Sequence, residues 1–210
     1  MGRWSVSILS AILGISALTF VCGFWGWDDG KRVVKVMSQP ERLVYFGYGS
    51  NLKGTRLQVS APSAKFEGIA RLDGFKLAFT TPSRRWGGAA ADVLEAHGGI
   101  VYGAMWSIAR SELLAVDDQE SVNQGQYFRD FQYVDELDSG FRSTGRKIKV
   151  LLYRVREPQP TLIPSKVYLR VILAGAKEIG LPPDYVHTIS LIKTTPYDNE
   201  TLYELFMGRA

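Results

Sequence analysis

The sequence predicts an α+β fold: a small, mixed, mostly antiparallel β-barrel or strongly curved sheet with flanking helices. Two observations carry this prediction. Segments rich in β-branched and aromatic residues, bounded by Gly, Asp, Pro or Ser, outnumber segments with helical spacing. The strand-like segments also do not alternate with helices, as they would in a parallel α/β fold. Of the 210 residues, 46% are hydrophobic and 22% are charged, which is the composition of a globular chain.

The strand-like segments follow a polar connector. The first is a short apolar run, Leu43-Val44-Tyr45-Phe46, which Gly47 and Gly49 interrupt. Each later segment carries the same β-branched or aromatic character. We expect strands over residues 43–46, 68–72, 75–80, 99–107, 127–134 and 147–155.

Two segments have helical spacing. Ser111 is a candidate N-cap for a helix over residues 112–119, with Leu113, Leu114 and Val116 facing inward. Ser165 is a candidate N-cap for a second helix that runs to Lys177, and Gly180 is a stop signal beyond it.

The N-terminal segment has a different composition. Residues 4–27 contain no charged side chain, and this run is long enough for one membrane-spanning helix. Phe24, Trp25 and Trp27 end the run, as aromatic residues do at a membrane interface. We expect residues 1–27 to be a single-pass membrane anchor, with a cleaved signal peptide and secretion as the alternative. Residues 28–41 then form a linker and residues 42–210 the domain.

Residue counts narrow the chemistry of this domain. Cys22 is the only cysteine and precedes the domain, so a thiol nucleophile, a disulfide and a thiolate metal site are excluded from it. His97 and His187 are far apart and have no metal-ligand spacing. The net charge of +4 is mild and the basic residues are scattered, so we expect no nucleic-acid partner. Carboxylates, hydroxyls and backbone amides remain, and we expect no metal and no cofactor.

The first feature with chemical meaning is a Gly-rich loop after the first strand. Its residues are Tyr45, Phe46, Gly47, Tyr48, Gly49, Ser50, Asn51 and Leu52. Glycines permit positive φ and close ligand approach, so successive N–H groups could form a nest for an anion such as a carboxylate. An ordinary Gly-rich turn remains the other interpretation.

The second feature is acidic. Asp117-Asp118-Gln119-Glu120 ends the first predicted helix. A helix C-terminus and neighbouring carboxylates both disfavour negative charge, which would raise the pKa of Glu120 in an apolar cleft. Such a group acts well as both base and acid near neutral pH. The alternative is a solvated acidic helix end.

Together these features resemble the γ-glutamyl cyclotransferase family, and further elements follow in the same order. The quoted elements are Tyr48-Gly49-Ser50-Asn51-Leu52, Asp117 to Glu120, Gly125-Gln126-Tyr127, Pro164 to Tyr168, and Gly175 to Pro182. The last of these looks most like the branch that acts on γ-glutamyl amino acids. The N-terminal apolar run departs from the family's usual soluble members.

The resemblance implies a cofactor-independent enzyme that releases 5-oxoproline and a free amino acid from a γ-glutamyl amino acid. It assigns Glu120 to general acid/base catalysis and the Tyr45 to Leu52 loop to binding of the γ-glutamyl unit. Tyr127 and Tyr168 would line the pocket, each with a core aromatic as the alternative. Three other functions stay open: the same chemistry on glutathione or γ-glutamyl-amines, an inactive binding module, and a membrane-anchored interaction domain. A homodimer also stays open.

Overall fold

The computed structural model describes residues 23–28, 31–36 and 41–208. The chain divides into two compact units, residues 1–40 and 41–210. In the first unit, strand β1 (Gly23–Asp28) pairs antiparallel with β2 (Lys31–Val36), from Gly23 opposite Val36 to Asp28 opposite Lys31.

This hairpin corrects the expectation of a membrane anchor over residues 4–27. The end of that run forms strand β1, and within the described residues no helix has the length and apolar character needed to span a membrane. The predicted single-pass transmembrane helix is therefore wrong. Aromatic residues favour a strand in this stretch, an effect that apolar length alone does not weigh. Residues 4–22 and the signal-peptide alternative lie outside the described residues.

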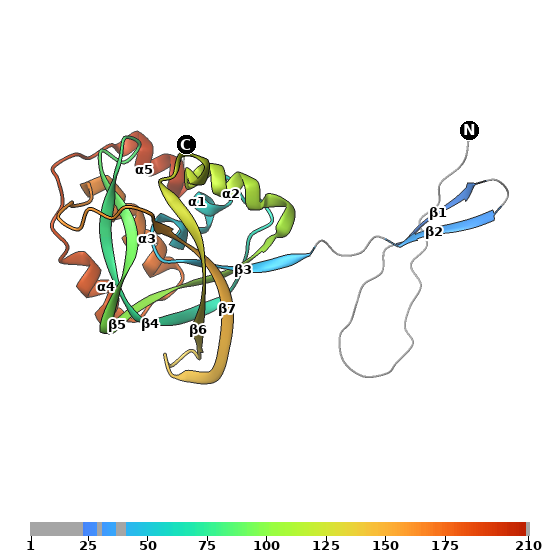
Figure 1. The fold of residues 1–210 in the computed structure, drawn as a ribbon, viewed down its shortest axis with the longest axis horizontal. Helices are drawn as coiled ribbons and strands as arrows, with labels where there is room; N and C mark the ends of the chain where they lie inside the picture. Colours follow the sequence, from blue (N-terminus) through green and yellow to red (C-terminus); the bar gives the residue numbers. More distant parts are fainter. Residues whose placement is uncertain (1–22, 29–30, 37–40, 209–210) are drawn as a thin grey trace. The chain divides into compact units, whose positions relative to one another are not determined.

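In the second unit, five strands form a closed barrel in the order β3-β5-β4-β6-β7 (Figure 1). The strands are β3 (Arg42–Gly47), β4 (Lys65–Ser83), β5 (Gly88–Ala109), β6 (Tyr127–Leu137) and β7 (Ser143–Val155). The β3–β7 pairing that closes the barrel is parallel, with Tyr45 opposite Leu151, and the other pairings are antiparallel. The predicted α+β class, with a mixed and mostly antiparallel sheet, is confirmed.

Helices flank the barrel. They are η1 (Ser50–Leu52), α1 (Gly54–Leu57), η2 (Arg110–Glu112), α2 (Leu113–Gln119), η3 (Val122–Gln124), α3 (Lys166–Glu178), α4 (Pro183–Ser190) and α5 (Glu200–Met207). Helix α3 contacts η1, α4 and α5, so it is the central element of the helical side. Its buried residues include Val171 and Ile172, while Phe46 of β3 and Leu152 of β7 belong to the same core.

Several local expectations need correction. Residues 68–80 form part of one long strand, β4, with a register shift between Asp73 and Phe75, where Gly74 has a φ of +81°. Ser111 is not the N-cap, because the chain enters η2 at Arg110 after Ala109. Leu114 points outward and is 72% exposed, whereas Val116 of the same helix is fully buried.

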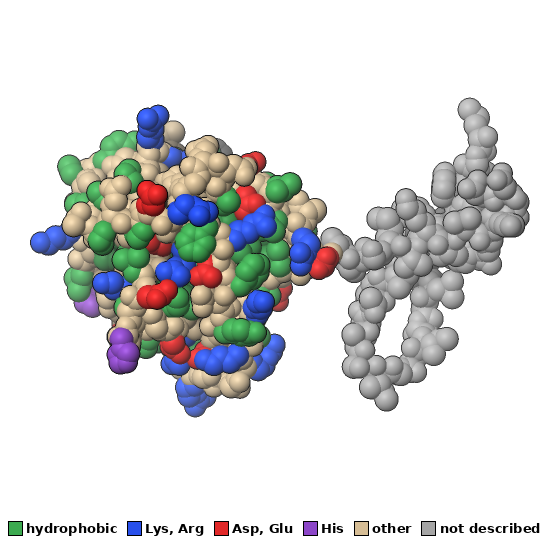
Figure 2. Space-filling view, in the orientation of Figure 1, with side chains coloured by type: hydrophobic (Ala, Val, Ile, Leu, Met, Phe, Trp, Pro, Cys, Tyr) green, Lys and Arg blue, Asp and Glu red, His purple; other side chains and the backbone are tan. Residues whose placement is uncertain are grey.

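The N-cap of the second predicted helix is confirmed. Ser165 Oγ accepts a hydrogen bond from the backbone N–H of Tyr168 at 3.3 Å. On the face that Figure 2 shows, basic and acidic side chains of the second unit are interspersed rather than gathered by sign. Charged side chains of the second unit also form ion pairs, such as Arg170 with Asp198 at 3.0 Å.

Candidate active site

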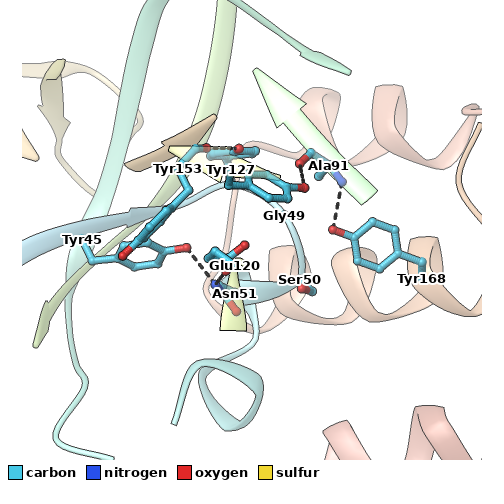
Figure 3. Close-up of a pocket in the computed structure, with 10 residues that line it drawn as sticks. Tyr45, Gly49, Ser50, Asn51, Ala91, Glu120, Tyr127, Tyr153 and Tyr168 are labelled. Carbon is cyan, nitrogen blue, oxygen red and sulfur yellow. Dashed lines mark hydrogen bonds between the residues drawn. The ribbon is translucent and has the colours of Figure 1, made fainter. Parts of the chain in front are cut away.

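A pocket lies where the end of β3 meets the barrel wall and α3. Its walls combine one short loop, several tyrosines, one small residue and one carboxylate (Figure 3). The lining residues are Tyr45, Tyr48, Gly49, Ser50, Asn51, Ala91, Glu120, Tyr127, Tyr153 and Tyr168.

The loop is shaped by close approach rather than by left-handed backbone. Neither Gly47 nor Gly49 has a positive φ, which corrects the expectation drawn from glycine's freedom. A Cβ atom on Gly47 would lie 2.8 Å from the backbone oxygen of Asn51, and one on Gly49 would lie 2.9 Å from Cβ of Ala91. The glycines therefore let the loop fold back on itself and let the pocket wall close. Because the first N–H groups of a helical turn have no partner within it, those at the start of η1 are available to a ligand.

A β-bulge supplies the opposite wall. The register of β4 and β5 shifts between Phe79 and Thr81, next to Ala91. Both backbone groups of Ala91 then serve tyrosines: its N–H donates to the Tyr168 hydroxyl at 3.1 Å, and its C=O accepts from the Tyr127 hydroxyl at 2.7 Å (Figure 3). The Tyr168 hydroxyl can therefore still donate a hydrogen bond to a ligand, whereas the Tyr127 hydroxyl oxygen can still accept one.

Two other tyrosines have their hydroxyls occupied by the protein. Tyr48 donates to the backbone oxygen of Tyr153. Tyr153 in turn donates to Asp117 Oδ1 at 2.7 Å, and Arg129 pairs with the same carboxylate through two nitrogens. Burial raises the pKa of Asp117, but the hydrogen bonds from Arg129 and Tyr153 outweigh burial and lower it. The rings of Tyr48 and Tyr153 therefore line the pocket, and their occupied hydroxyls hold them in place.

Glu120 follows α2 directly and is partly buried, with its carboxyl group in the centre of the pocket (Figure 3). Its Oε1 accepts from the side-chain amide of Gln119 at 2.9 Å and from that of Asn51 at 3.1 Å. Burial raises the pKa of the carboxyl, while these two amides and the nearby charges of Arg56 and Arg85 oppose the rise. The raised pKa of Glu120 therefore comes from burial and not from the neighbouring carboxylates, as the sequence had suggested, because Arg129 neutralises the charge of Asp117.

Within the described part of the chain, no three His, Cys, Asp or Glu side chains lie close enough to hold a metal ion together. His97 and His187 are both exposed and neither lines the pocket.

Comparisons with known proteins identify the family of this chain. Residues 100–189 match the AIG2-like family. The γ-glutamylcyclotransferase of Bos taurus is 34% identical over 169 residues, which cover 79% of this chain and 86% of the bovine protein. The human γ-glutamylcyclotransferase is 32% identical over the same shares. The chain belongs to the γ-glutamylcyclotransferase family.

Solved structures place the fold in the same family. A γ-glutamyl cyclotransferase superposes with a TM-score of 0.72 at 31% identity, covering 80% of this chain and 99% of its own. A yeast γ-glutamyl cyclotransferase specific to glutathione superposes with a TM-score of 0.51 at only 11% identity, which shows a shared fold and nothing finer.

Most of the residues predicted for a γ-glutamylcyclotransferase site lie together in the pocket. They are Tyr45, Tyr48, Gly49, Ser50, Asn51, Glu120, Tyr127 and Tyr168. Phe46 and Leu52 instead point into the core, where both are fully buried, and Gly47 packs on the loop's own backbone. Along β3, alternation sends Phe46 to the face opposite its neighbour Tyr45.

Two lining residues were not predicted. Ala91 has no reactive side chain, and its part in the site comes from a bulge that only the strand register reveals. Tyr153 lies in the uniformly buried run Val150–Tyr153, so no alternation marks which face it occupies. The sequence signal for Tyr153 was a tyrosine within an apolar strand. A buried tyrosine hydroxyl needs a hydrogen-bond partner, which indicates a polar group or a pocket nearby.

Proposed function

We propose that this pocket is the active site of a γ-glutamylcyclotransferase, with γ-glutamyl amino acids as substrates and Glu120 as the proton-transferring residue. The observation that carries the proposal is the placement of Glu120. A single carboxyl group with a raised pKa occupies the centre of a tyrosine-lined pocket. A residue of this kind can both accept and return a proton near neutral pH.

The reaction needs no protein nucleophile. The α-amino nitrogen of the γ-glutamyl unit attacks its own γ-carbonyl carbon, a C–N bond forms, and the bond to the leaving amino acid's nitrogen breaks. The products are 5-oxoproline and the free amino acid. Because the attack is intramolecular, effective concentrations on the order of 10⁵–10⁸ M are available once the chain is held in a reactive conformation.

Proton transfer is the part that the protein must supply. The substrate's α-ammonium is protonated at pH 7 and cannot attack, so Glu120 as carboxylate removes one of its protons. Glu120 as carboxylic acid then gives that proton to the leaving nitrogen, which departs as an amine. The attacking nitrogen then carries one proton more than the lactam nitrogen of 5-oxoproline, and it loses that proton to water as the ring closes. The released amine takes up one proton from water, so protons and charge balance and Glu120 returns to its starting form.

The hydrogen-bonding groups left free in the pocket suit the substrate's glutamyl end. The Tyr127 hydroxyl oxygen and Glu120 can accept from an ammonium group, while the Tyr168 hydroxyl can donate to a carboxylate. The N–H groups at the start of η1, around Gly49 and Ser50, can donate to the same carboxylate or to the oxyanion that forms during attack. The possible homodimer stays a prediction.

The test is release of 5-oxoproline by the purified full chain from γ-glutamyl-alanine, glutathione and γ-glutamyl-lysine, each followed by product chromatography. We expect turnover with γ-glutamyl-alanine and little with the other two. Preferred turnover of glutathione or γ-glutamyl-lysine would keep the chemistry and overturn the substrate class. Saturable binding of all three without product would instead identify an inactive binding module.

A further inference from the structure

A buried arginine lies behind the pocket with no carboxylate of its own. Arg56 of α1 is only 4% exposed, and it forms no ion pair with any described residue. Its guanidinium lies over the ring of Phe206, 5.1 Å from the ring centroid, and its Nη1 donates to the side-chain oxygen of Gln119. A buried cation is costly without compensation, so the group that compensates its charge matters.

The arginine determines which way the Gln119 amide faces. A guanidinium only donates hydrogen bonds, so the Gln119 atom beside it must be the oxygen. Ser60 Oγ donates to the same oxygen at 2.8 Å. The Gln119 nitrogen is thereby turned toward Asn51 Oδ1, at 3.2 Å, and toward Glu120 Oε1, at 2.9 Å.

The same logic continues through the next amide. Because Gln119 donates to Asn51, the Asn51 atom beside it must be the oxygen, and its nitrogen points the other way. That nitrogen donates to Glu120 Oε1 at 3.1 Å and to the Tyr45 hydroxyl oxygen at 2.8 Å. Both amides therefore reach one oxygen of Glu120. In the described part of the chain, no hydrogen bond is formed to the other oxygen, Oε2.

We propose that Arg56 is a positioning residue that acts through Gln119 and Asn51 to hold Glu120 by Oε1 and leave Oε2 to carry the proton. The inference rests on the proposed function of Glu120. Arg56 does not line the pocket itself. The negative charge of Glu120, across one intervening amide, favours the charged guanidinium and opposes the effect of its burial. Restraining one oxygen of the carboxyl lets the other face both substrate nitrogens in turn.

Charges around Glu120 determine what loss of Arg56 should do. The Gln119 amide, the Arg56 charge and the Asn51 amide all favour the carboxylate and oppose the pKa rise caused by burial. Arg85 acts in the same direction, and Asp117 of the preceding helix is paired with Arg129. The remaining titratable groups that face the pocket are the hydroxyls of Tyr45, Tyr48, Tyr127, Tyr153 and Tyr168.

The experiment compares Arg56→Met and Gln119→Met with wild type, using the pH dependence of kcat and KM for γ-glutamyl-alanine. We expect kcat to fall about 10- to 100-fold, as for loss of a charge-assisted hydrogen bond, with KM changed less than about threefold. The acidic limb of the kcat profile should move to higher pH in both variants, because each removes an interaction that favours the carboxylate. Gln119 is partly exposed, so its variant stays informative if Arg56→Met does not fold.

Arg71→Met is the matched control. Arg71 pairs with Asp73 and Asp135 on the barrel and does not contact the network. The Arg71→Met variant should leave kcat and the acidic limb of its pH profile unchanged. An unmoved limb in folded Gln119→Met, or an equal kcat loss in Arg71→Met, would overturn the positioning role.

A second measurement separates this inference from the proposed function. Titration of the Glu120 carboxyl carbon by ¹³C NMR reports its ionisation without turnover. If wild type releases no 5-oxoproline, the proposed function fails. A higher titration midpoint in Gln119→Met would still support the hydrogen-bonded chain, and an identical midpoint would refute it.

Discussion

Gly175 lies inside helix α3 where that helix passes over the pocket loop. A Cβ atom at this position would lie 2.5 Å from the backbone nitrogen of Lys53 and 2.7 Å from the carbonyl carbon of Leu52. Both are main-chain atoms, so no side-chain rotation can relieve the contact. We therefore expect Gly175→Ala to push α3 away from the loop, although alanine is the better helix former.

Two opposing effects determine the magnitude. Alanine in a helix interior is favoured over glycine by about 1 kcal/mol. Overpacking a core costs about 1–3 kcal/mol. Because the added methyl group would contact main-chain atoms, we expect the destabilisation at Gly175 to be about 3 kcal/mol. The net loss is then about 2 kcal/mol, which for a domain of this size lowers Tm by about 4–8 °C.

Urea unfolding followed by circular dichroism measures this difference, and enzyme assays test its consequence. Because α3 also carries Tyr168, Gly175→Ala should raise KM for γ-glutamyl-alanine. Gly180→Ala is the control: Gly180 has a φ of +73°, and a Cβ atom there would meet no other atom within 4 Å. Its strain of about 1–2 kcal/mol should leave KM unchanged. A Gly175→Ala protein at least as stable as wild type would refute the packing argument.

Two further predictions concern the pocket. Burial raises the pKa of Glu120 above the unfolded value, so the folded state binds the extra proton and loses stability as pH rises through that window. Glu120→Gln should therefore exceed wild type in free energy of unfolding at pH 8, with the gap closing toward pH 4, and a gap independent of pH would contradict this. Tyr127→Phe leaves the buried carbonyl of Ala91 without its donor and should cost about 1–3 kcal/mol and most of the turnover. Tyr133→Phe, on the exposed side of the same strand, should cost neither, and equal losses in the two variants would argue against a special role for Tyr127.

Local signals explain what could be predicted from the sequence. Ser165 caps α3 because a serine before a helical pattern satisfies a free N–H, and that needs no knowledge of the rest of the fold. The loop from Tyr48 to Asn51 was recognisable from its glycines and its family motif. Its place in the pocket follows from the loop's own turn.

Features that depend on contacts between residues far apart in the chain could not be predicted from the sequence. The first half of β5, residues 88–98, is rich in Gly and Ala, which have little strand preference, and pairing with β4 makes it a strand. The roles of Ala91 and Tyr153 depend on register and on which face of the barrel a residue occupies. The buried charge of Arg56 gave no local signal either, because its partner Gln119 lies 63 positions away in the chain.

The most direct test of the proposed mechanism is 5-oxoproline release by Glu120→Gln. Glutamine keeps the size of the side chain and can still occupy the site beside Asn51, but it cannot take or give a proton. We predict a folded protein whose turnover of γ-glutamyl-alanine is lower by about 100-fold or more, the usual effect of losing a general acid/base. Turnover close to wild type in a folded Glu120→Gln protein would contradict the central claim.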